Sequence, residues 1–261
     1  VVLVMLPIAV ERLVTANNNT EFCLPSVEDI AAVSFAEIRK SRVKIAVMMQ
    51  GVSKIAGSAS PENLKTVLGD LHRHSVTQYI NNGTLTDAYF ERADASLDDP
   101  NIYIVISNTG SAASEIISVF TQKQFNHASL SFDSDLDTII SYNGGGNVYP
   151  PGLNPEILEQ LHQKDDASIM VFSLPVTKEQ KALILNKIAE INREGSAYNI
   201  VGLFVKRSYK PNIMFCSQFV YKMLKLAGVQ YFEKKDGEVR PTDLIELDYY
   251  KKLRFEYEIK F

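Results

Sequence analysis

Two residues in the second half of the chain carry the side chains needed for nucleophilic catalysis, Cys216 and His127. Apolar residues follow the cysteine at spacings of three, four, seven, eight and eleven, which predicts a helix that begins near Cys216 and ends at Gly228. The amino terminus of a helix carries partial positive charge and unpaired N–H groups, and both stabilise a thiolate, the nucleophilic form of cysteine. The alternative interpretation of Cys216 is a small buried core residue.

A thiolate nucleophile needs a base, which is normally an imidazole, and His127 is the best candidate. It begins the segment 127–133, in which polar and apolar residues alternate, so that the histidine shares one strand face with hydroxyl residues. The alternative is a solvent-facing strand histidine. A third polar group should orient the imidazole, and the next strand offers Ser141 and Asn143, neither of which is charged.

Three other motifs are incomplete, so neither a metal site nor a cofactor is predicted. Asp133–Asp137 resembles the start of a calcium loop but has no glycine at the sixth position and no glutamate at the twelfth. Gly144–Gly146 is not followed by the Lys-Ser or Lys-Thr of a phosphate-binding loop. His72 and His74 have no acids or thiols nearby at metal-ligand spacing, and a solvated turn is the preferred interpretation.

The elements that must position these residues follow from hydrophobic periodicity. The sequence predicts strands over 102–106, 127–133, 138–143, 168–174 and 253–261, with a helix over 111–120. Thr177 and Gln180 fit a capping box, which predicts a further helix after the fourth of these strands.

The first part of the chain contains no chemical motif. Ser60-Pro61-Glu62 is typical of a helix start. Asn81-Asn82-Gly83 predicts a hairpin turn between strands at 76–80 and 85–90. With a boundary at Asp98-Asp99-Pro100, we expect a small α/β domain of unassigned role over 1–98, followed over 99–261 by the domain that carries the chemistry.

Composition excludes several classes of protein. The chain has 261 residues, of which 46% are hydrophobic and 22% charged, as in globular domains. Its formal charge of -4 argues against nucleic acid as a partner, and no apolar run is long enough to span a bilayer. Two free thiols are favoured over a disulfide between Cys23 and Cys216. Val1–Val10 is apolar and is either a buried helix or strand or the remnant of an export signal, so the compartment stays open.

Three segments together resemble a known family: Phe125–Asp133, Ile140–Tyr142 and Phe215–Val220. They are similar to the circularly permuted branch of NlpC-type papain-like proteins, which includes bacterial YiiX-like proteins and is related to lecithin retinol acyltransferase. In that branch the histidine strand precedes the cysteine helix. Tyr198-Asn199 and Pro241–Leu244 also resemble recurring elements of the group.

The resemblance covers about residues 101–261. It implies an α+β fold in which an antiparallel sheet packs on helices, with the nucleophile at a helix amino terminus. It makes Cys216 the nucleophile and His127 the base, and it places Ser141 where relatives often have an orienting Glu or His. The residues expected at the oxyanion or substrate-binding site are Tyr198, Ser217 and Asn143.

The resemblance also implies an activity. We expect a cysteine hydrolase that cleaves an amide bond of a small, cell-wall-type peptide through a thioester intermediate. One alternative is an acyltransferase or thioesterase with a lipid substrate. Another is a binding module whose catalytic site has decayed, an interpretation motivated by the uncharged Ser141 at the third position.

Overall fold

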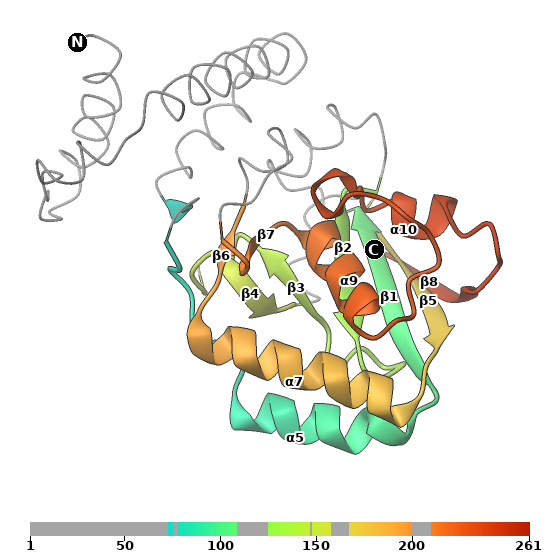
Figure 1. Ribbon diagram of the computed structural model, residues 1–261, viewed down its shortest axis with the longest axis horizontal. Coiled ribbons are helices and arrows are strands. Elements are labelled where there is room, and N and C mark those ends of the chain that lie inside the picture. Colours follow the sequence, from blue (N-terminus) through green and yellow to red (C-terminus); the bar gives the residue numbers. More distant parts are fainter. Residues whose placement is uncertain (1–72, 76–77, 109–124, 147, 158–166, 200–209) are drawn as a thin grey trace, which may run out of the picture. The chain divides into compact units, whose positions relative to one another are not determined.

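The computed structural model describes residues 73–75, 78–108, 125–146, 148–157, 167–199 and 210–261 (Figure 1). The chain divides between residues 50 and 51, and all described residues belong to the second of the two units. Cys23, Val1–Val10 and the helices expected after Ser60 and over 111–120 lie outside the described residues.

The second unit is an α+β structure built on an antiparallel sheet, as expected. The six strands lie in the order β4-β3-β2-β1-β5-β8, and every neighbouring pair is antiparallel. The strands are β1 (Asn101–Asn108), β2 (His127–Ser131), β3 (Ile140–Asn143), β4 (Gly152–Pro155), β5 (Ser168–Pro175) and β8 (Arg254–Lys260). A separate parallel pair joins β6 (Ala197–Tyr198) to β7 (Ile213–Met214). The five predicted strands of the second half are confirmed, whereas β4 was not predicted.

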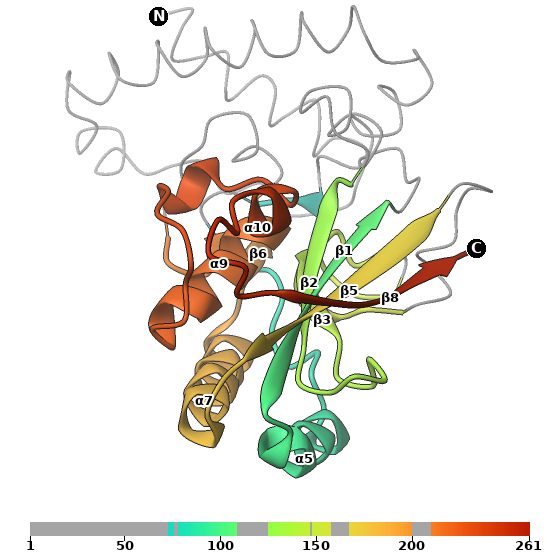
Figure 2. The ribbon, with the colours of Figure 1, turned by 90° about the vertical axis from the view of Figure 1, so that its right-hand side faces the viewer.

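Helices cover one face of this sheet, as Figures 1 and 2 show. The α-helices are α5 (Asp87–Ala95), α7 (Lys178–Glu194), α9 (Cys216–Leu226) and α10 (Asp243–Glu246), and the 3-10 turns are η2 (Ser96–Asp98) and η4 (Asp236–Glu238). Helix α9 packs on β2 and β3. Within the described ranges, none of the helices has both the length and the apolar character that a membrane crossing requires.

The ends of α7 and α9 lie where the sequence places them. Thr177 accepts a hydrogen bond from the Gln180 N–H, and the Gln180 side chain accepts one from the Thr177 N–H, so the predicted capping box is confirmed. Helix α9 ends one residue before its cap at Ala227, and Gly228 follows with a φ of 68°, a conformation that favours glycine.

The predicted strand over 85–90 is wrong, because this segment enters helix α5. Thr86 caps the helix by accepting a hydrogen bond from the Tyr89 N–H, and Asp87 places a negative charge in the first turn. Tyr89 and Ala93, four residues apart, are the buried side chains of the helix. The turn at Asn81–Gly83 therefore leads into a helix and not into a second hairpin strand.

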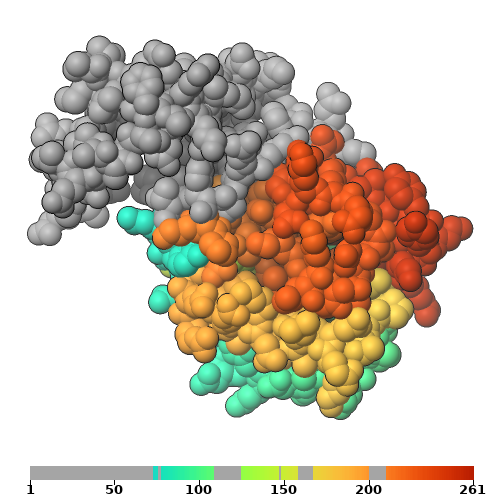
Figure 3. All heavy atoms as spheres, in the orientation of Figure 1, coloured from blue at the N-terminus to red at the C-terminus, as the bar shows by residue number. Residues whose placement is uncertain are grey.

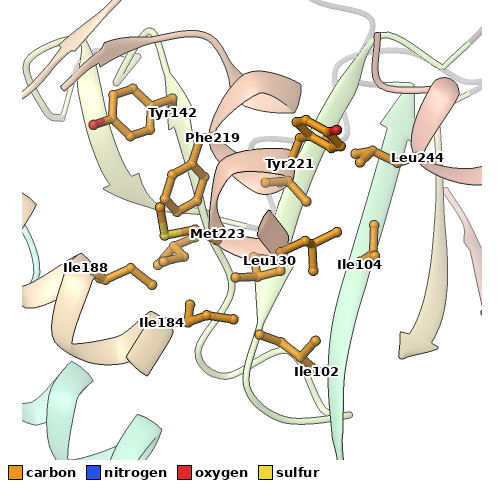
Figure 4. Packing of buried hydrophobic residues seen from close by; sticks show 14 of the residues in the cluster. Ile102, Ile104, Leu130, Tyr142, Ile184, Ile188, Phe219, Tyr221, Met223 and Leu244 are labelled. Carbon is orange, nitrogen blue, oxygen red and sulfur yellow. The ribbon is translucent and has the colours of Figure 1, made fainter. Parts of the chain in front are cut away.

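A large apolar core fills the space between the sheet and the helices (Figure 4). Ile102, Ile104 and Leu130 contribute from the strands, and Ile184 and Met223 contribute from α7 and α9. A smaller cluster that includes Tyr103 and Val105 lies on the opposite face of the sheet. In Figure 3, α7 and the chain after residue 210 cover much of the helical face of the described unit.

The predicted domain boundary near residue 98 lies inside this unit. Leu85, Tyr89 and Ala93 belong to the same core as β1. Lys181 adds a polar tie: its buried ammonium donates to the carbonyl oxygens of Ser96, Asp99 and Phe132 at 2.7, 3.0 and 2.8 Å.

Candidate active site

Cys216 is the first residue of α9, as the apolar spacing predicts. Phe215 at the N-cap is extended and has no side chain that accepts a hydrogen bond, so the N–H groups of the first turn have no side-chain cap there. The preceding strand β7 holds the entry to the helix, because the Met214 carbonyl accepts from the Asn199 N–H at 2.8 Å. Cys216 is a free thiol and is 1% exposed.

His127 at the start of β2 lies between Cys216 and a carboxylate. Its Nε2 is 2.6 Å from Oε1 of Glu156, and the side chains of the two residues are 12% and 6% exposed. The ring also lies close enough to Cys216 for that side chain to raise its pKa. Because Glu156 occupies Nε2, the ring nitrogen left to face the thiol is Nδ1. The nucleophile and the base expected from the sequence are therefore in contact.

Glu156 is the site residue that the sequence interpretation missed. It directly follows β4, and its N–H donates to the Ile139 carbonyl at 3.0 Å, which continues the pairing of β4 with β3. Its Oε1 also accepts from Ser129 Oγ at 3.2 Å and from Ser141 Oγ. A buried carboxylate with two hydroxyl donors and an imidazole is well stabilised as an anion.

The charges of this group shift both pKa values. Burial lowers the pKa of His127, but the negative charges of Glu156 and Cys216 outweigh burial and raise it from 6.5 to about 10. Burial raises the pKa of Glu156, but the charge and hydrogen bond of His127 and the donors Ser141 and Asn143 bring it below its ordinary value. Near neutral pH, the pair is an imidazolium beside a carboxylate.

The pair should make stability depend on pH. The raised pKa of His127 gives stability that is complete below 6.5 and is lost as the pH rises through about 10. The lowered pKa of Glu156 gives stability that is complete above 4.5 and is lost as the pH falls through its folded value. Glu156→Gln should therefore cost most between about pH 5 and 6.5, roughly 2 kcal/mol of unfolding free energy. Urea unfolding of both proteins measures this, and an equal cost at about pH 10 would contradict the assignment.

Ser141 and Asn143 lie beside this pair on β3. Ser141 Oγ is 3.1 Å from His127 Nε2 and donates to Glu156. The uncharged serine thus lies next to the orienting carboxylate and does not replace it. Asn143 Nδ2 donates to Ser141 Oγ at 3.2 Å, and its Oδ1 accepts from the Gly145 N–H and from Asn154, so its amide is engaged by protein groups.

Tyr198 and Ser217 have different surroundings. Tyr198 is buried, and burial followed by the negative charges of Cys216 and Glu156 raises its pKa well above the ordinary value. The Ser217 hydroxyl is fully buried and donates to the Val239 carbonyl at 2.7 Å. Tyr198 therefore lies near Cys216 and Glu156, whereas the side chain of Ser217 supports the segment after α9.

His74 also lies close to this centre, although its position in the sequence favours a solvated turn. Its ring centroid is 5.7 Å from that of Tyr198. Neighbouring Arg73 donates to the carbonyl oxygens of Gly144 and Tyr149 at 3.4 and 3.1 Å. The segment 73–75 thus borders Tyr198 and the loop at Gly144–Gly146, hereafter the glycine loop.

The arrangement contains the parts of a nucleophile, a base and a group that orients the base. Cys216 is at the positive end of a helix, His127 contacts it, and Glu156 holds the imidazole from the other side. Such a group can attack and hold an acyl carbon. In comparisons with known proteins, no family model, no curated protein and no solved structure matches this chain.

Proposed function

We propose that this protein is a cysteine hydrolase that cleaves an amide bond through a thioester intermediate. The observation that carries the proposal is a largely enclosed imidazole that adjoins the Cys216 thiol and pairs with the Glu156 carboxylate. An imidazole beside a thiol at the start of a helix is the combination that activates a cysteine nucleophile. We also propose the permuted papain-like arrangement that the resemblance of 101–261 implies.

The first half of the reaction forms the thioester. In the reactive form the proton of Cys216 already resides on His127 Nδ1, so the pair is a thiolate beside an imidazolium, and the thiolate sulfur attacks the carbonyl carbon of the scissile amide. The carbonyl electrons move to oxygen, where first-turn N–H groups of α9, aided by Tyr198, stabilise the negative charge. When the tetrahedral intermediate collapses, the C–N bond breaks and the His127 imidazolium gives its proton to the leaving nitrogen.

The second half releases the acid. His127 takes a proton from water, and the resulting hydroxide attacks the thioester carbon. The C–S bond then breaks, and Cys216 leaves as the thiolate beside the reprotonated imidazole. Glu156 stays ionised throughout, and its role is to keep the proton of His127 on Nε2 and to stabilise the imidazolium.

The substrate class follows from the resemblance, which favours a small peptide of the cell-wall type. The position of Glu156 argues against the alternative that this protein is a binding module with a decayed catalytic site. That interpretation rests on an uncharged third residue, and Glu156 supplies a charge 2.6 Å from the imidazole. The proposal therefore favours an active enzyme over a decayed one.

The first test measures the reactivity of Cys216. In a Cys23→Ser background, iodoacetamide at about pH 6.5 should label Cys216 at least about tenfold faster than it labels free cysteine, because an adjacent imidazolium stabilises the thiolate. His127→Ala should remove this advantage. Peptide mapping by mass spectrometry locates the label. Labelling no faster than that of free cysteine would overturn the proposal.

A further inference from the structure

We propose that Asn143 is a positioning residue: its amide, oriented by the backbone N–H of Gly145, directs the Ser141 proton onto Glu156 and so keeps the His127 proton on Nε2. This assignment rests on the proposed function and gives the glycine loop a role. The hydrogen bonds of Asn143, Ser141 and Glu156 form one continuous chain from this loop to the imidazole.

The backbone N–H of Gly145 fixes the donor and acceptor order of these hydrogen bonds. A backbone N–H only donates, so the Asn143 atom 2.8 Å from the Gly145 nitrogen is the carbonyl oxygen Oδ1. Nδ2 is then the atom 3.2 Å from Ser141 Oγ. Gly145 has a φ of 72°, and a Cβ there would lie 2.0 Å from the Tyr149 carbonyl oxygen, so this N–H needs glycine to reach its place.

The orientation of Asn143 decides where the serine proton goes. Ser141 Oγ has one proton, and it accepts from Asn143 Nδ2, which only donates. Two groups beside Ser141 could accept this proton, His127 Nε2 at 3.1 Å and the Glu156 carboxylate. Nε2 carries a proton in the imidazolium, so the hydroxyl donates to the carboxylate. Because the carboxylate is held by donors, it stays the acceptor for His127 Nε2, and Nδ1 is left for the thiol.

Two further side-chain amides, those of Asn154 and Asn81, hold Asn143 in this orientation. Asn154 Nδ2 donates to the Pro150 carbonyl at 2.9 Å and to Asn143 Oδ1 at 3.0 Å. Its Oδ1 accepts from Asn81 Nδ2 at 2.8 Å, and Asn81 also donates to the Pro150 carbonyl at 2.7 Å. Backbone carbonyls therefore fix both of these amides, and Asn143 cannot turn over without leaving one of them unpaired.

The sharpest variant is Asn143→Asp, which keeps the acceptor for Gly145 and replaces the donor to Ser141 by a second acceptor. Ser141 then divides its proton between two carboxylates, and their repulsion raises the pKa of Glu156. Among the described residues, the titratable groups that face Glu156 are His127 on β2 and Tyr198 on β6. Cys216 on α9 lies next to His127 and Tyr198, and Arg73 borders the loop. With Glu156 partly protonated, the imidazolium loses its counter-charge.

We expect Asn143→Asp in the Cys23→Ser background to react with iodoacetamide about tenfold more slowly at about pH 6, with recovery toward about pH 8. A through-space effect of the new charge has the opposite sign, because it would stabilise the imidazolium and speed alkylation. Faster or unchanged alkylation would therefore overturn the inference. The matched control is Asn192→Asp, at a residue whose side-chain amide bonds the backbone N–H and carbonyl of Leu85, and its alkylation rate should be unchanged.

Two further readouts cover other outcomes. If Asn143→Asp does not fold by circular dichroism, nitrogen NMR of the His127 ring in the parent protein decides, because Nε2 should keep its proton as the pH rises past about 10. A neutral ring protonated on Nδ1 would overturn the inference. A parent protein whose Cys216 reacts no faster than free cysteine would overturn the proposed function itself, whereas a reactive parent with an unaffected Asn143→Asp variant would overturn only the role of Asn143.

Discussion

Cys216→Ala should abolish turnover, with a loss of about 10⁶-fold in kcat, because the sulfur that forms the thioester is gone. The alanine fits a position that is already buried at the start of α9 and leaves the apolar face of the helix intact. The variant should therefore remain folded, so that the lost activity reports chemistry and not stability.

The natural substrate need not be known to measure this loss. p-Nitrophenyl acetate acylates an activated thiol, so the parent protein should give a burst of p-nitrophenol and gain one acetyl group on Cys216, seen by mass spectrometry. Cys23→Ser should behave as the parent does. Soluble cell-wall peptides and long-chain acyl esters, assayed side by side, distinguish amide cleavage from lipid chemistry. Turnover that survives in Cys216→Ala, or an acetyl group on another residue, would refute the proposed mechanism.

Glu156→Gln should lower kcat by about 10²- to 10⁴-fold with a smaller change in KM. The glutamine side chain is nearly isosteric, but its amide N–H can donate to Nε2 and so favours the tautomer that carries the proton on Nδ1. An imidazole in that tautomer cannot accept the proton of Cys216. The effect should exceed that of Ser141→Ala, because the serine contributes hydrogen bonds but no charge.

The matched control for this prediction is Glu190→Gln on α7. Glu190 pairs with Lys187 at 2.5 Å and its side chain is 39% exposed, so its removal should leave kcat unchanged. Steady-state kinetics with an activated ester give kcat and KM for both variants. If Glu156→Gln keeps kcat within about threefold of the parent value, Glu156 does not orient the base.

Sequence patterns were sufficient for Cys216 and His127 because both lie in regular elements with one apolar face. The spacing after Cys216 predicts α9, and the alternation after His127 predicts β2. Glu156 escaped because β4 reads Gly-Leu-Asn-Pro after two further prolines, which is typical of a loop. Pro155 is tolerated in a strand here because β4 lies at the edge of the sheet, where only one side of the strand is paired.

The error at 85–90 has a different origin. Asn81-Asn82-Gly83 is a strong turn signal, and Gly83 does have a positive φ of 67°. The turn signal does not specify the type of the next element, and Thr86 and Asp87 begin a helix only three residues later. The series of hydrogen bonds that runs from Asn81 through two further asparagines to Ser141 could not be predicted from local patterns either. Its two ends are 60 positions apart in the sequence.

The place of β4 at the edge of the sheet would separate the proposed activity from global folding. Glu156 reaches the imidazole through a four-residue strand that pairs with one neighbouring strand, β3, and is otherwise held by side-chain amides and by the hydroxyls of Ser196 and Thr84. Fraying of this edge would withdraw the carboxylate while β1, β2 and β5 remain intact. A population of molecules that is native by every bulk spectroscopic measure would then be inactive, and its size would follow the local opening equilibrium of β4 instead of the melting temperature.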